Sequence, residues 1–244
     1  MLSKALYGLR QAPRAWNSKL DGCLKQLGFK RCPYEYVVYI RKKNGKLLIV
    51  GVYVDDLIVT GDSDLEVEHF KEQMSKKFEM NDLGMLSYYL GFEVNQHDGA
   101  VTLKQVVYAK NIIVKTGMTD CNPCKYPMEP KLELTKDKEG EEVNITDYIS
   151  VVGALRYLTH TRPDISYVVG LVSRIMERPT VQHMKVVKHI LSYVKGTMDH
   201  GLVYTRGSKE TIITGYTYSD HARDVNDGRS TGGMAYYLNE NLVT

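Results

Sequence analysis

Two adjacent acidic residues, Asp55 and Asp56, interrupt an apolar stretch of this chain. Residues 47–52 lead into the acidic pair and residues 57–59 lead out of it, with many β-branched side chains in both runs. Such short apolar runs predict two buried strands that meet at a tight turn. Two carboxylates at that turn repel each other, and a divalent cation relieves the repulsion. Magnesium is typically held by one or two carboxylates together with substrate phosphates, so the pair predicts the start of a phosphoryl-transfer site.

An ordinary hairpin is the alternative interpretation of the acidic pair, because aspartate is common in turns of every kind. Two-residue hairpin turns usually contain a glycine that adopts a positive φ. No glycine adjoins Asp55 or Asp56, which favours the metal site only slightly. The tetrapeptide at residues 53–56 therefore leaves both interpretations open.

Composition sets the limits within which the acidic pair must act. A chain of 244 residues is long enough for one large or two small domains. Its net charge is only +3, so any contact with nucleic acid must come from local basic patches. No apolar run approaches the ~20 residues of a membrane helix, and the N-terminus lacks the apolar core of a signal peptide. We therefore expect an intracellular protein without a membrane partner.

Four cysteines do not indicate a disulfide scaffold. Cys121 and Cys124 have the spacing of half a zinc site or of a redox pair, but no second pair of suitable ligands accompanies them. We interpret this segment as a loop with two free thiols. The histidines are expected to be structural or surface residues: His160, His183 and His189.

The first half of the chain mixes strands with helices. The expected order is a turn and helix in residues 6–27, strands in 36–40 and 46–54, the acidic turn, a helix after 63, strands in 88–94 and 101–103, and a helix in 104–116. Asn44 and Gly45 predict a hairpin. Ser63 and Glu66 have the spacing of a capping box, and Gly117 is a typical residue for ending a helix.

The second half is mainly helical. Residues 131–144 are poor in apolar side chains and are the best candidate for a linker. Helices are expected in residues 147–160, 163–177 and 180–196, and strands in 212–218 and 233–238. One face of the third helix carries Lys185, Lys188 and Lys195. Such a face can follow a phosphate backbone, but a solvated surface is the commoner explanation and is favoured from these residues alone.

Motifs along nearly the whole chain resemble the reverse transcriptase of copia-type (Ty1/copia) LTR retrotransposons, a part of their Pol polyprotein. The sequences LYGLRQAPRAW at residues 6–16 and YVDDL at 53–57 carry most of the resemblance. Further matching segments follow in the order that the family has: residues 82–84, 89–91, 152–158, 161–165, 173–174, 183 and 193–197. Together these motifs are highly specific.

The resemblance implies an α+β fold. It implies a partial reverse-transcriptase palm, an antiparallel sheet with packed helices, in residues 1–96. A palm-to-thumb segment and linker would follow in 97–146, and a helical thumb or connection in 147–206. Residues 207–244 would be the truncated start of a ribonuclease H-like domain. The segment after residue 220 departs from the family pattern, which leaves the fold of that last part open.

In this family the acidic hairpin supplies two of three palm carboxylates that hold two magnesium ions, or manganese in their place. The resemblance implies that Asp55 is the main metal ligand and catalytic residue, with Asp56 secondary. Tyr53 would pack near the primer end. The substrates would be an RNA template, a DNA primer and deoxynucleoside triphosphates. Family members act in cytoplasmic particles and then in the nucleus.

Other residues receive roles from the same resemblance. The turn and helix that floor the nucleotide pocket would contribute template or nucleotide contacts: Tyr7, Gly8, Gln11 and Arg14. The thumb would grip the duplex, which favours contacts with the nucleic-acid backbone for Lys185, Lys188 and Lys195. Asp220 would be a remnant of the ribonuclease H site. Residues such as Gly8, Trp16 and Arg162 have an alternative role in shaping or packing helix starts.

The third palm carboxylate belongs, in this family, upstream of the segment with which this chain begins. We therefore expect a polymerase fragment with little or no activity alone, which the rest of a Pol polyprotein would complete. The alternative is a retrotransposon relic without enzymatic activity, or a retained nucleic-acid-binding or interaction protein. A nuclease that uses Asp55 and Asp56 is a weaker third hypothesis, because the surrounding motifs are those of a polymerase palm.

Overall fold

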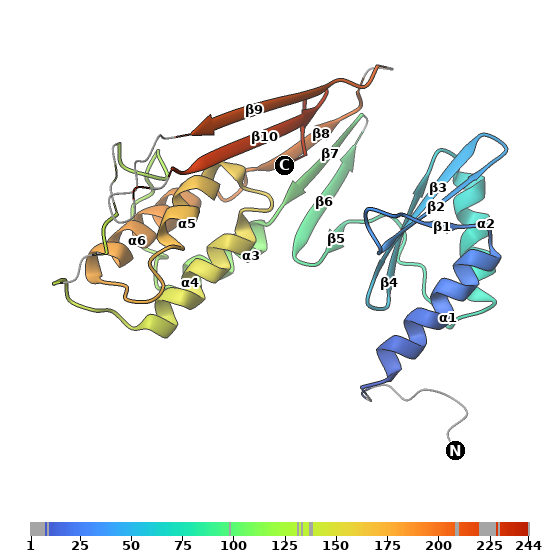
Figure 1. The fold of residues 1–244 in the computed structure, drawn as a ribbon, viewed down its shortest axis with the longest axis horizontal. Coiled ribbons are helices and arrows are strands. Elements are labelled where there is room, and N and C mark those ends of the chain that lie inside the picture. Colours follow the sequence, from blue (N-terminus) through green and yellow to red (C-terminus); the bar gives the residue numbers. More distant parts are fainter. Residues whose placement is uncertain are drawn as a thin grey trace. The chain divides into compact units, whose positions relative to one another are not determined.

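The computed structural model describes residues 8, 10–97, 99–130, 132, 134–136, 139–207, 210–219, 228 and 230–243. It separates into two compact units, Met1–Leu86 and Ser87–Thr244 (Figure 1). Each unit has a hydrophobic core of its own. The boundaries expected from the family resemblance, at residues 96, 146 and 206, stay predictions.

The first unit is an antiparallel sheet with two helices. Its strands lie in the order β1 (Lys30–Arg31), β2 (Val38–Lys43), β3 (Lys46–Tyr53) and β4 (Asp56–Gly61). The helices are α1 (Ala12–Gln26) and α2 (Asp64–Ser75). Asn44 and Gly45 both have positive φ, 51° and 75°, which confirms the hairpin expected there.

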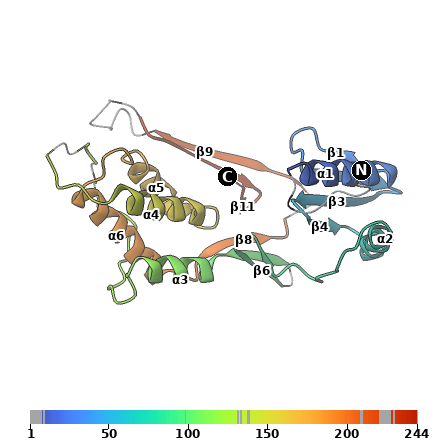
Figure 2. The ribbon, with the colours of Figure 1, turned by 90° about the horizontal axis from the view of Figure 1, so that it is seen from below.

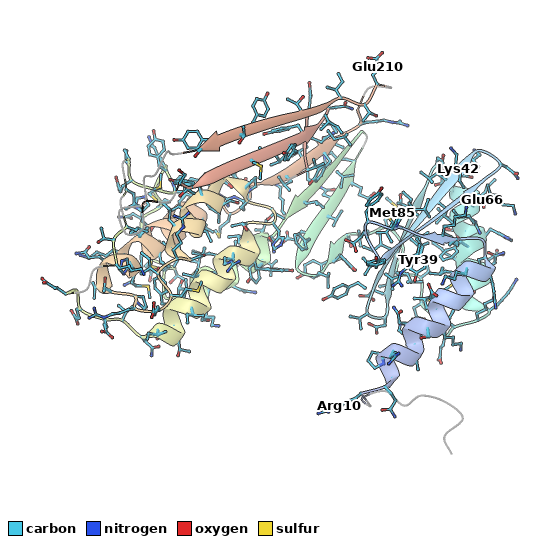
Figure 3. All side chains as sticks on the ribbon, in the orientation of Figure 1. Arg10, Tyr39, Lys42, Glu66, Met85 and Glu210 are labelled. Atoms are coloured by element: carbon cyan, nitrogen blue, oxygen red, sulfur yellow. The ribbon has the colours of Figure 1, made fainter. Side chains whose placement is uncertain are left out.

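Alternation along β2 and β3 places one face of this sheet in the core. Leu48, Val50 and Val52 are buried and pack with side chains of α1 and α2, such as Leu24 and Phe70. Tyr39 of β2, labelled in Figure 3, is buried, and its hydroxyl donates to Asp21 Oδ1 of α1 at 2.9 Å. Because the strand period is two, the side chains between these residues lie on the opposite face of the sheet.

The second unit joins two small sheets to a helical core (Figure 2). One sheet has the order β5 (Tyr88–Tyr89), β6 (Phe92–His97), β7 (Ala100–Lys104) and β8 (Gly201–Thr205), and the other has the order β11 (Asn241–Leu242), β10 (Gly232–Leu238) and β9 (Ile213–Ser219). The helical elements are α3 (Val106–Lys115), α4 (Ile145–Leu158), η1 (Pro163–Ile165), α5 (Ser166–Val172) and α6 (Val181–Gly196). Their buried side chains form one cluster that includes Tyr148, Leu155, Val168 and Ile190.

The mixed α+β composition and the antiparallel sheets agree with the expected fold class. Three local expectations are wrong. Residues 88–94 are not one strand, because Leu90 and Gly91 have φ of 50° and 82° and turn the chain between β5 and β6. The helix expected to run to 177 ends at Val172, where the backbone bonds from Arg174 and Ile175 reach back only three residues and tighten the last turn.

The third wrong expectation is the capping box at Ser63 and Glu66. Ser63 is the N-cap of α2, but its side chain makes no capping hydrogen bond. Glu66 instead accepts a 2.8 Å hydrogen bond from the buried Arg41. A capping box does form at α6, where Thr180 pairs with His183.

The helices of the described residues are too short or too polar for a bilayer crossing. The expectation that Cys121 and Cys124 are free thiols is confirmed, since neither forms a disulfide. Both lie in the loop between α3 and α4, and burial raises the pKa of the Cys124 thiol.

Candidate active site

The acidic pair sits on the hairpin between β3 and β4. Tyr53 pairs with Asp56, so Val54 and Asp55 are the two residues of the turn itself. Val54 has a φ of 53°, a conformation that is a genuine outlier for a β-branched residue. The turn therefore forms without glycine because Val54 takes the left-handed conformation, and strained backbone of this kind concentrates at functional sites.

Both acidic side chains face solvent. Asp55 and Asp56 are exposed, and Tyr53 beside them is 48% exposed. Directly paired residues of an antiparallel ladder share one face, so Tyr53 and Asp56 lie on the same side of the sheet. That side is opposite to the face that packs on α1 and α2, because Val52 next to Tyr53 is buried.

Two carboxylates are the metal donors that this turn offers. Within the described part of the chain, no group of three or more histidine, cysteine, aspartate or glutamate side chains is placed to hold a metal ion. The chemistry of Asp55 and Asp56 fits a magnesium ion that keeps water or takes substrate phosphates as its other ligands. It does not fit a closed structural site, which requires a full set of protein ligands.

Trp16 connects helix α1 to this turn. Its indole Nε1 donates a 2.8 Å hydrogen bond to the backbone carbonyl of Val54. The indole ring also meets Phe78 edge to face, with centroids 5.0 Å apart and planes at 81°. Sequence reasoning gave Trp16 only a packing role and missed this bond. The available signal was the indole N–H, which usually finds a hydrogen-bond partner when its ring is buried.

Of the other residues that the family resemblance assigns to the nucleotide pocket, Gln11 and Arg14 lie at the start of α1, and Gly8 precedes that helix. Gly8 has a φ of 90°, and open space surrounds the position that a Cβ would occupy. Gln11 is the N-cap of α1 without a side-chain capping bond, and Arg14 is exposed on the first turn. Tyr7 lies outside the described residues. Arg14 and Trp16 both belong to α1, the helix that is hydrogen-bonded to the acidic turn through the Trp16 side chain.

The three lysines of α6, in the second unit, have different environments. Lys185 and Lys188 are exposed. Lys195 is half-buried, and its ammonium donates to the backbone carbonyls of Thr119 and Cys121, at 2.6 Å each. Asp220 lies outside the described residues.

Residues 92–94, at the start of β6, are tied to helix α3. Glu93 on β6 accepts a 2.8 Å hydrogen bond from the backbone N–H of Val107, in the first turn of that helix. Tyr157 of α4 donates to the carbonyl of Leu90, and its ring lies 5.9 Å from that of Phe92. The short β5–β6 hairpin is thus held by two helices.

Comparison with known proteins places these features in context. The family model described as reverse transcriptase (RNA-dependent DNA polymerase) matches residues 1–130. The retrovirus-related Pol polyprotein from transposon RE1 of Arabidopsis thaliana is 33% identical over 243 residues, which are 100% of this chain and 16% of that protein. No solved structure matches the chain.

Two further relatives differ in how much of their own length is matched. The Pol polyprotein from transposon TNT 1-94 of Nicotiana tabacum is 32% identical over 254 residues, covering 100% of this chain and 19% of the relative. An uncharacterised mitochondrial protein of Arabidopsis thaliana is 38% identical over 193 residues, covering 79% of this chain and 80% of the relative. The chain thus spans less than a fifth of the Pol polyproteins.

Proposed function

Because the chain belongs to the reverse transcriptase (RNA-dependent DNA polymerase) family, we propose that its acidic turn is the metal-binding part of a nucleotidyl-transfer site. The single observation that supports this most directly is the exposed Asp55–Asp56 pair on a strained two-residue turn. The substrates proposed are a nucleic-acid template, a primer and deoxynucleoside triphosphates. A further proposed partner is the rest of a Pol polyprotein, of which this chain matches less than a fifth.

Bound magnesium, or manganese, supplies Lewis-acid activation of the attacking hydroxyl and neutralises charge on the phosphates. Asp55 is the proposed main ligand, because it lies in the turn itself, and Asp56 is the second. Tyr53 shares its face of the sheet with Asp56 and offers an exposed aromatic ring against the primer terminus. In this proposal Asp55 and Asp56 hold the metal, and Tyr53 orients the primer terminus. None of the three donates a proton to the reaction.

Gln11 and Arg14 are the proposed contacts to the template or the incoming nucleotide. Both lie at the exposed start of α1, the helix that reaches the acidic turn through Trp16. The Arg14 guanidinium suits a phosphate because its donors form a fork with matching geometry. Gly8 is proposed to let backbone approach the substrate closely, because no side chain fills the space beside it.

The test is magnesium-dependent primer extension on an RNA template, carried out with this segment completed by the rest of an active Pol polyprotein, with Asp55→Asn as the variant. This change keeps the side-chain shape and removes the charge that binds the metal. We expect Asp55→Asn to abolish nucleotide incorporation. The matched control is Asp64→Asn, the same replacement at an exposed acid on α2, which should leave incorporation within about twofold. Measurable and equal incorporation by Asp55→Asn and the wild type in that completed polymerase would contradict the proposal.

A nucleic-acid-binding protein without enzymatic activity is the second candidate. The exposed Lys185 and Lys188 on α6 support it, because they belong to the second unit and not to the acidic turn. In this case Asp55→Asn leaves RNA affinity unchanged or slightly tighter, since it removes a negative charge. Measuring RNA binding and primer extension on the same variant separates the two functions.

A further inference from the structure

The acidic turn needs something to hold it in its conformation. Val54 sits at a φ of 53°, where the branched Cβ of an L-residue crowds its own backbone. Conformations of this kind persist only when surrounding contacts over-determine them.

Trp16 makes the contact that meets this need. Its Nε1 is 2.8 Å from the Val54 carbonyl oxygen, a normal distance for an N–H donor. The donor is itself fixed from two sides. Phe78 packs edge-on against the indole ring, and α1 inserts Leu20 and Leu24 into the core of the first unit. The position of the indole N–H is therefore set independently of the turn.

The hydrogen bond and the turn conformation depend on each other. The Val54 carbonyl belongs to the peptide that joins Val54 to Asp55. If Val54 left the left-handed region, this peptide would rotate, which would carry the carbonyl away from Trp16 and move the backbone of Asp55 at the same time. A bond that selects one orientation of the peptide thus also selects one position for the Asp55 carboxylate.

We infer that Trp16 is a positioning residue for the acidic turn, because its indole N–H holds the Val54 carbonyl and keeps the turn in the conformation that presents Asp55. The metal-binding consequence rests on the proposed function. The conformational consequence does not, because it concerns only the turn. The two can therefore fail separately.

The experiment removes the indole N–H and keeps an aromatic ring, as in Trp16→Phe. Trp16 is the only tryptophan of the chain, so benzothienylalanine, an isosteric tryptophan analogue without the N–H, can also be incorporated at this one site. The matched control is Tyr39→Phe, which deletes another aromatic hydrogen bond between α1 and the sheet, far from the turn in sequence. Manganese affinity of each protein is measured by calorimetry.

Loss of the N–H should weaken manganese binding about threefold to tenfold in both replacements, the range that one hydrogen bond of typical net strength spans. Tyr39→Phe should stay within about twofold of the wild type. Adding Val54→Gly to Trp16→Phe should restore most of the affinity, because glycine adopts positive φ without a supporting bond. A purely packing role for Trp16 predicts neither the loss with the isosteric analogue nor this rescue.

Unchanged manganese affinity in the two Trp16 replacements, or a loss that Val54→Gly does not restore, would overturn the inference. If the wild-type chain binds no manganese, the proposed metal site fails, and the backbone ¹³C shifts of Val54 then decide about Trp16. Shifts that leave the left-handed range in Trp16→Phe support the positioning role. Shifts that remain left-handed contradict it.

Discussion

Arg162 is a buried cation, only 2% exposed, and its guanidinium makes polar and aromatic contacts. Its guanidinium binds Asp164 through two hydrogen bonds of 2.9 and 2.7 Å and donates to both the carbonyl and the hydroxyl of Thr197. Tyr193 donates to Asp164 at 2.8 Å and lies under the guanidinium, 5.5 Å from ring centroid to Cζ. This network joins η1 to the end of α6.

Asp164 gives the second unit a pH dependence. Burial disfavours the charged form of this carboxyl, but hydrogen bonds from Arg162 and Tyr193 outweigh burial and lower its pKa. A folded-state pKa below the unfolded value of about 3.9 means that the carboxylate stabilises the fold above that pH, and the contribution is lost as pH falls through the folded-state pKa. In Asp164→Asn, the free energy of unfolding of this unit should therefore fall less between about pH 5 and pH 3 than it does in the wild type. Urea unfolding of both proteins across that range measures this difference. The same pH dependence of the unfolding free energy in both proteins would contradict the prediction.

The lysines of α6 differ in what their ammonium groups bind. Lys185 and Lys188 are exposed. If they contact phosphates, replacing both by alanine should lower the slope of RNA affinity against salt concentration by about two released counterions. The free energy of unfolding should stay unchanged. Lys195→Met should instead lower stability by about 1–3 kcal/mol, because it leaves the carbonyls of Thr119 and Cys121 without their donor. Filter binding at several salt concentrations, together with urea melts, separates the two effects. A salt slope that both proteins share would contradict the role of Lys185 and Lys188.

At the scale of elements, helix starts that look alike in the sequence are held differently. Thr180 and His183 form a reciprocal capping box on α6, whereas the Ser63 side chain makes no capping bond on α2. The His183 Nδ1 accepts from the Thr180 N–H, so its Nε2 carries the proton that is donated to the Thr135 carbonyl at 2.8 Å. The residues at an N-cap position therefore do not by themselves reveal whether the cap forms.

Thr180→Ala should cost about 1 kcal/mol of unfolding free energy, because it removes a cap that the structure uses. Ser63→Ala should stay within about 0.5 kcal/mol of the wild type, because it removes none. Chemical denaturation of the two single variants measures the difference. Equal losses would mean that Ser63 caps α2 in solution.

At the scale of the whole molecule, two hydrophobic cores share no residue. Leu48 belongs to the core of the first unit and Leu155 to that of the second, and both side chains are fully buried. Leu48→Ala and Leu155→Ala are the same chemical change, and each should cost its own unit about 2–5 kcal/mol. Hydrogen exchange should speed up in residues 38–61 for the first variant and in residues 145–194 for the second. Faster exchange in both segments for either variant would contradict independent cores.

The family and the main local elements of this chain can be predicted from sequence, because they rest on short-range patterns. The β3–β4 hairpin follows from two β-branched runs around Asp55 and Asp56, and the β2–β3 turn follows from Asn44-Gly45. The break at Leu90 was missed because a leucine at positive φ leaves no turn signal in the sequence. Glycine at 91 was the only cue, and it lay inside an otherwise strand-like run.

Sequence alone was enough to predict Asp55 and Asp56 as the candidate residues for chemistry at the acidic turn, since a carboxylate pair in an apolar hairpin is a matter of residue type and spacing. Only the tertiary structure decided how that turn is held. The Trp16–Val54 bond joins residues 38 positions apart, and the Arg162–Thr197 bond joins residues 35 positions apart. Such contacts follow from how helices pack on sheets and on each other, because that packing decides which acceptor a hydrogen-bond donor can reach.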